Sequence, residues 1–236
     1  MCPPHSPFHD NVIEGGTVGV NASASEETFY NCRLAGIDPP QYHDQTWLYA
    51  GHADLARNYI GNMTAEGVRV RSYMTVSYPS FPRAHVEATR NRIEDNVHGI
   101  HLEGNAVGHT TYTVYANLSD NNTVANNAQY GIYVDAATVD LVKLRVWWND
   151  VRDNTAAGLY VTGDPPGPDY FHAECNWWNS AGGPYDPIPP PAGEPDWNDN
   201  PDPNAQPVSD YFWYRDLDND PYWLQEPSLT ATSCKL

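Results

Sequence analysis

The chain has 236 residues, of which 40% are hydrophobic and 18% charged, so it can bury one sizeable core. Its 30 acidic residues against 12 basic ones give a formal charge of −18, and this negative field excludes nucleic acid as a partner and disfavours anionic lipid. No run of about 18 apolar residues occurs, so we expect no membrane span.

A repeating pattern built around asparagine runs along most of the chain. An apolar residue follows two positions after most of these asparagines, and a Gly followed by alternating apolar residues comes later in each copy. The markers are Asn11, Asn31, Asn58, Asn91, Asn122, Asn149 and Asn176. Such spacing is typical of a solenoid, and the short alternating runs rich in β-branched residues indicate strands. We therefore predict a parallel β-helix, with an irregular second turn because Arg33 occupies an apolar position.

Stacking of the turns predicts continuous columns of inward-facing apolar side chains. After the glycines, the columns are Val68, Ile100, Ile132 and Leu159, and then Val70, Leu102, Val134 and Val161. After the asparagines, the column is Ile13, Ile60, Ile93, Val124, Val151 and Trp178. We expect the marker asparagines to take left-handed corners and to bond to the asparagines of neighbouring turns.

The C-terminal part carries a recognisable motif. The sequence NWWNSAGGP at residues 176–184 resembles the NWWG-S-x-x-GP motif that closes many bacterial surface β-helix domains, although Asn179 stands where Gly is usual. The turns themselves resemble those of the pectin-lyase-like superfamily. The resemblance implies an all-β, right-handed parallel β-helix of about seven turns with a C-terminal cap. We expect the helix over 1–183 and a Pro/Asp-rich strap with the cap over 184–236.

Seven of the eight tryptophans lie from Trp147 onward, and the open end of a solenoid needs a lid. We expect the lid to use Trp177, Trp178, Trp213 and Trp223. The alternative is that some of them, Trp197 above all, are exposed platforms for sugar rings.

Four cysteines fall into two groups at the ends of the chain, which favours the disulfides Cys2–Cys32 and Cys175–Cys234. Disulfides would place the protein outside the cell or on its surface. The alternative is four free, buried thiols. Because the N-terminal residues lack the features of a signal peptide, either the chain is cytosolic or a targeting segment has been removed.

Polar side chains are expected in two columns on the outer face beside the inward columns. The first holds Arg69, His101, Tyr133 and Tyr160, and the second holds Arg71, Glu103, Asp135 and Thr162. Enzymes with this fold act on polysaccharides along such a face, so the resemblance makes Arg69, His101, Glu103 and Asp135 the catalytic candidates. A binding site would use Arg69, Arg71, His101, Tyr133 and Tyr160. The simpler interpretation is a solvated face with ion pairs between strands.

The acidic stretch at residues 216–220 places Asp216, Asp218 and Asp220 at alternate positions, which would suit calcium, although it lacks the features of an EF-hand. The alternative is an acidic loop, and we expect no other cofactor.

We expect a non-catalytic secreted or cell-surface module that is structural or binds polysaccharide. An uncapped first turn would present an open edge, which either continues in a longer protein or meets another subunit. The alternative function is a polysaccharide lyase or glycoside hydrolase, but the Asp-Asp and Gly-His-Gly patterns of polygalacturonase-like enzymes are absent.

Overall fold

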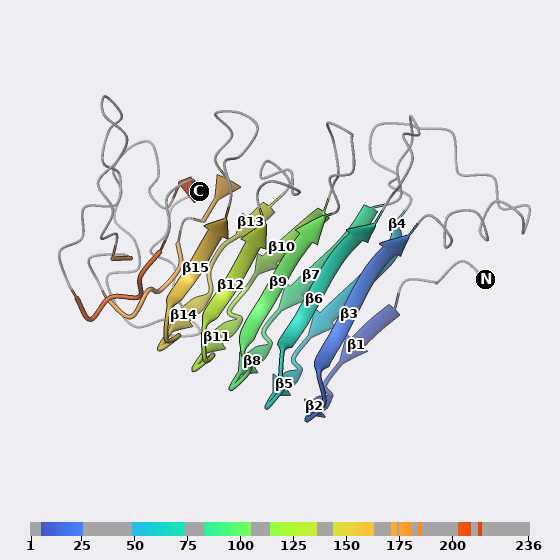
Figure 1. The fold of residues 1–236 in the computed structure, drawn as a ribbon, viewed down its shortest axis with the longest axis horizontal. Helices are drawn as coiled ribbons and strands as arrows, with labels where there is room; N and C mark the ends of the chain where they lie inside the picture. The colour runs from blue at the N-terminus through green and yellow to red at the C-terminus, as the bar shows by residue number, and fades with distance from the viewer. Residues whose placement is uncertain are drawn as a thin grey trace, which may run out of the picture.

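The computed structural model describes residues 6–25, 49–73, 83–104, 114–135, 144–162, 171–173, 175–180, 184–185, 203–208 and 212–213. These residues form 17 β-strands and no helix. The strands lie in three parallel sheets; from β1 to β15 each turn of the chain adds one strand to each sheet in succession, and β16 and β17 then extend the first sheet (Figure 1). The predicted all-β parallel β-helix is therefore confirmed.

The first sheet has seven strands, whose bounds are β1 (Ser6–His9), β4 (Tyr49–Ala56), β7 (Arg83–Thr89), β10 (Val114–Ser119), β13 (Leu144–Val146), β16 (Phe171–His172) and β17 (Phe212–Trp213). The second has five short strands: β2 (Val12–Glu14), β5 (Tyr59–Gly61), β8 (Arg92–Glu94), β11 (Thr123–Ala125) and β14 (Asp150–Arg152). The third has β3 (Val18–Ser25), β6 (Glu66–Tyr73), β9 (His98–Gly104), β12 (Tyr130–Asp135) and β15 (Ala157–Thr162).

The core is the set of inward columns that the repeat predicts. Val68, Ile100, Ile132 and Leu159 pair in register on neighbouring strands, and none is more than 1% exposed. The column after the asparagines ends on Trp178, which is fully buried. The first sheet adds small residues such as Ala116 between Val86 and Leu144.

Two ladders of amides flank the second sheet, one beginning in the first turn at Asn11 and the other at Asn96. In the first, the backbone N–H and the Nδ2 of each asparagine both donate to the Oδ1 of the next, at 2.9–3.2 Å; its members are Asn11, Asn58, Asn91, Asn122, Asn149 and Asn176. The second runs through Asn96, Asn127 and Asn154 and ends on Gln206, whose Oε1 accepts from the Asn154 N–H at 2.7 Å. The predicted bonds between stacked asparagines are confirmed.

The prediction that Asn31 belongs to the first ladder is wrong. Asn11 donates directly to Asn58, and β1 to β3 pair directly with β4 to β6. Asn31 and Arg33 themselves lie outside the described residues.

The left-handed corners are also shifted by one residue from the prediction. A positive φ belongs to the residue before each ladder asparagine, as in Arg57 (57°), Arg90 (56°) and Trp148 (54°). Each ladder asparagine thus follows the corner, and this position lets its backbone N–H and its side chain reach the same oxygen.

A column of glycines lets neighbouring turns approach at the start of the third sheet. A Cβ on Gly131 would lie 2.6 Å from the carbonyl oxygen of Gly158 and 2.8 Å from Asn154 Nδ2. Any side chain there would push the third sheet away from the second amide ladder, so the glycine of the repeat is required by packing.

Candidate functional site

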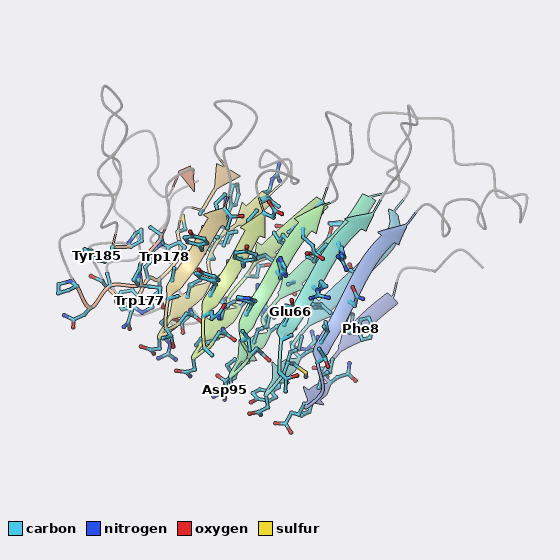
Figure 2. The ribbon with its side chains drawn as sticks, in the orientation of Figure 1. Phe8, Glu66, Asp95, Trp177, Trp178 and Tyr185 are labelled. Atoms are coloured by element: carbon cyan, nitrogen blue, oxygen red, sulfur yellow. The ribbon has the colours of Figure 1, made fainter. Side chains whose placement is uncertain are left out.

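The outer face of the third sheet brings the polar residues of the prediction together. Arg69 pairs in register with His101, His101 with Tyr133, and Tyr133 with Tyr160. In the neighbouring column Arg71 pairs with Glu103, and Asp135 with Thr162. The face is turned toward the viewer in Figure 2, where Glu66 is labelled on β6.

Sequence reasoning missed a third column on this face. Glu66, His98 and Tyr130 each stand immediately before a glycine of the repeat and pair in register on β6, β9 and β12. Their shared offset from Gly67, Gly99 and Gly131 is the signal that could have revealed them.

A network of charges links these columns. The carboxylate of the buried Glu66 accepts from Arg69 Nη2 at 2.5 Å, and its Oε1 lies 3.2 Å from His101 Nδ1. The other ring nitrogen of His101 lies 3.7 Å from Glu103 Oε2, and Glu103 in turn pairs with Arg71. His101 therefore lies between two carboxylates, each of which also holds a guanidinium.

The surroundings of Glu66 keep it ionised. Burial raises its pKa, but the hydrogen bonds and charges of Arg69 and His101 together outweigh burial, so the pKa is lowered from its usual value. An ionised Glu66 acts as an acceptor and as an anchor for Arg69 and His101, and it is a poor general acid at neutral pH.

Aromatic rings form a stack beside this network. Tyr130 stacks on His98 at 5.4 Å and on Tyr160 at 4.6 Å, and those two residues lie on the turns before and after it. Tyr133 likewise lies between His98 at 5.2 Å and Tyr160 at 6.2 Å, with nearly parallel planes. Tyr130 thus has a ring within stacking distance on the turn before and on the turn after it, so a ligand would meet its edge and its hydroxyl group.

The stack also shifts the pKa values of its members. Burial, followed by the nearby His101, lowers the pKa of His98, so its imidazole is neutral at pH 7. Burial, followed by the neighbouring Tyr160 and Tyr133, raises the pKa of Tyr130.

Three polar atoms at this site are shielded from solvent and have no hydrogen-bond partner within the part of the chain that the structure describes. They are Glu66 Oε2, Arg69 Nε and His98 Nδ1. A buried polar atom without a partner costs roughly 1–3 kcal/mol, and such groups call for an explanation such as a binding role. The side chain of Arg69 is 27% exposed, whereas that of Glu66 is 6% exposed.

The other predicted sites fall partly outside the described residues. Asp216, Asp218 and Asp220 lie outside them, and among the residues that are described no group of three or more His, Cys, Asp or Glu could hold a metal ion. Cys175 is disulfide-bonded, but Cys2, Cys32 and Cys234 are not described, so both predicted pairings stay predictions. No helix in the described ranges is long and apolar enough to cross a membrane.

The C-terminal tryptophans divide in the same way. Trp178 is buried in the last part of the core, and Trp177 and Tyr185 lie close by at that end of the helix (Figure 2). Trp178 therefore contributes to the hydrophobic core. Trp197 and Trp223 lie outside the described residues, and the side chain of Trp213 is not described.

The fold and its ladders define a β-helix repeat protein. Residues 9–168 match the family described as "Protein of unknown function (DUF1565)", and because this match covers more than half of the chain, the chain belongs to that family. No curated protein and no solved structure matches the chain significantly.

Proposed function

We propose that this chain is a non-catalytic β-helix module of a secreted or cell-surface protein, and that it binds an extended polysaccharide on the outer face of its third sheet. The observation that carries the proposal is the row of polar side chains in which buried Glu66 holds Arg69 and His101. An exposed ion pair alone would contribute under about 1 kcal/mol and would need no such support. The resemblance of the turns to the pectin-lyase-like superfamily and of residues 176–184 to the closing motif of surface β-helix domains, both inferred from the sequence alone, would favour the same class of ligand.

The extracellular location is part of the proposal and is supported by the cysteines. Cys175 is disulfide-bonded, and the predicted pairs Cys2–Cys32 and Cys175–Cys234 would tie down both ends of the chain. Assembly with other subunits through the first turn also belongs to the proposal.

The test is an array of plant, fungal and bacterial polysaccharides probed with the purified protein. Arg69→Ala should weaken binding at least about tenfold, because it removes a guanidinium from the centre of the face. Arg92→Ala is the matched control: Arg92 pairs with buried Glu94 at 2.7 Å, as Arg69 does with Glu66, but it lies on the second sheet. Equal loss in both variants, or no binding to any polysaccharide, would refute the proposal.

A second candidate is a polysaccharide lyase or glycoside hydrolase acting at the same face. The position of His101 between Glu66 and Glu103 favours it, since an imidazole held by carboxylates can serve as a general base. Glu103 and Asp135 are the carboxylates that such an enzyme would use in catalysis. Turnover of a polysaccharide that is lost in His101→Ala would establish this candidate in place of the first.

A further inference from the structure

The charges on the outer face indicate whether a neutral or a charged polysaccharide fits it. Arg69 and Arg71 supply two positive charges against the three carboxylates of Glu66, Glu103 and Asp135. Both guanidiniums are already paired, Arg69 with Glu66 and Arg71 with Glu103. His101 lies between the carboxylates of Glu66 and Glu103, and burial keeps His98 neutral by lowering its pKa.

Among its described residues, the face therefore offers no unpaired cation to a uronate, and the formal charge of −18 on the whole chain repels a polyanion further. A chain of uronates would bring one carboxylate per sugar to a surface on which both arginines are already paired with carboxylates. A neutral polysaccharide meets no such repulsion.

The hydrogen-bonding groups of the face have the pattern that sugar hydroxyls require. Glu66 Oε2 is an acceptor and Arg69 Nε is a donor, and both belong to one ion pair that uses only their other atoms. Each hydroxyl of a vicinal diol can donate one bond and accept others, so one can donate to the carboxylate while its neighbour accepts from the guanidinium. Reaching these shielded atoms requires the partly exposed side chain of Arg69 to rotate.

The neighbouring rings restrict how the sugar can lie. Because Tyr130 lies between the stacked rings of His98 and Tyr160 on the turns before and after it, a sugar ring cannot lie flat on Tyr130. Contact through hydroxyl groups and ring edges favours polar recognition of the diol.

Resting on the proposed function, we infer that the ligand of this face is a neutral polysaccharide whose vicinal hydroxyls are bound by Glu66 and Arg69. Glu66, which immediately precedes Gly67, is then the main determinant of binding. Carbohydrate binding can hold even if the ligand is charged or if Glu66 and Arg69 do not bind it.

The experiment is calorimetric titration with neutral hexasaccharides of glucose, xylose and mannose and with hexagalacturonate, at about 20 mM and about 500 mM salt. We expect a neutral hexasaccharide to bind with a Kd that changes less than about twofold between the two salt concentrations, because no net charge is neutralised. Glu66→Gln should weaken binding at least about tenfold, since a charge-assisted bond is replaced by a neutral one. Glu94→Gln, in the matched pair on β8, should leave Kd unchanged.

The outcomes distinguish carbohydrate binding itself from the binding of a neutral ligand by Glu66 and Arg69. Tighter binding of hexagalacturonate that weakens with salt would overturn the inference and leave the proposed function standing. Binding of a neutral hexasaccharide that is equally strong in Glu66→Gln and in Arg69→Gln, with both variants folded, would overturn the assignment to these residues. If no oligosaccharide binds, both the inference and the proposed function fail.

Discussion

Asn122 illustrates what a single residue contributes to this fold. It is fully buried, and its Oδ1 accepts both the backbone N–H and the Nδ2 of Asn91 at 3.0 and 2.9 Å. Its own Nδ2 donates to the carbonyl oxygens of Ala88 and Ser119 and to Asn149. Such an amide joins three turns, and removing it leaves several buried groups unpaired.

We predict that Asn122→Ala lowers the free energy of unfolding by about 3 kcal/mol or more, because at least two buried donors of Asn91 lose their acceptor. Chemical denaturation measures the change. Asn126→Gly is the control: Asn126 is exposed with φ of 55°, a conformation that glycine adopts freely, so its effect should stay under about 1 kcal/mol. Similar losses in both variants would show that the ladder is not what holds the turns.

Neighbouring residues of one strand test the register of the third sheet. Ile132 is 1% exposed, so Ile132→Asp buries a lone carboxylate and should cost about 4 kcal/mol or more, enough to unfold the chain. Tyr133→Asp should cost about 1 to 2 kcal/mol, because it loses ring contacts with His98 and Tyr160 on the outer face. Thermal denaturation compares the two variants, and equal damage would mean that the strand faces are assigned wrongly.

At the scale of the strand, the third sheet shows which parts of the site the sequence could predict. Positions after the glycine follow strict alternation, so Arg69, His101 and Tyr133 could be placed on the outer face from their spacing. Before the glycine the alternation breaks, because Gly67 and Val68 both face the core, and simple counting would put Glu66 inside with Val68. The contacts of Glu66 depend on this irregular step.

Other features depend on contacts that are distant in sequence. Gln206 ends the second ladder by bonding to Asn154, 52 residues earlier, and nothing near Gln206 repeats the asparagine pattern. The marker Asn31 shows the opposite error: an asparagine at a plausible spacing does not enter the ladder, because Asn11 bonds directly to Asn58.

The ring stack gives the sheet a dependence on pH. His98 has a folded-state pKa below the value of about 6.5 that it has in an unfolded chain, so the unfolded chain binds a proton first as the pH falls. The stability that this provides is complete above about pH 6.5 and is lost as the pH falls toward the folded-state pKa. The contribution of Glu66, whose pKa is also lowered, is lost only at more acidic pH, below its unfolded value of about 4.3.

We predict that His98→Phe, which keeps a ring in the stack but cannot titrate, reduces the fall in Tm between about pH 7.5 and about pH 5.5. Differential scanning calorimetry at the two pH values measures this fall. A variant that loses as much Tm as the parent would show that another group is responsible.

The described residues form a stack of turns, and residues 203–208 pack against its last turn. The Gln206 side chain accepts a hydrogen bond from the Asn154 N–H and donates one to the Asn154 carbonyl oxygen. The Gly158 N–H donates to the Pro207 carbonyl at 2.8 Å, and Val208 forms a parallel β-bridge with Leu159. Residues 203–208 thus supply a further rung against β15, and Trp178 lies buried beside it.

We predict that Gln206→Ala opens this end first. The variant leaves the backbone N–H of Asn154 without an acceptor and should cost about 2 to 3 kcal/mol. Hydrogen exchange should rise at Asn154 and Gly158 before it rises at Ile100. Gln129→Ala, at an exposed glutamine, is the control, and uniform exchange along the helix in Gln206→Ala would contradict the role of this end.

The central claim is that the outer face of the third sheet binds polysaccharide and does no chemistry on it. The most direct measurement incubates the protein with each polysaccharide that it binds and follows both new reducing ends and the absorbance of unsaturated ends. We predict binding without either product, and the same result for His101→Ala and Glu103→Gln. Product formed by the parent and lost in either variant would contradict the claim and make this face an active site.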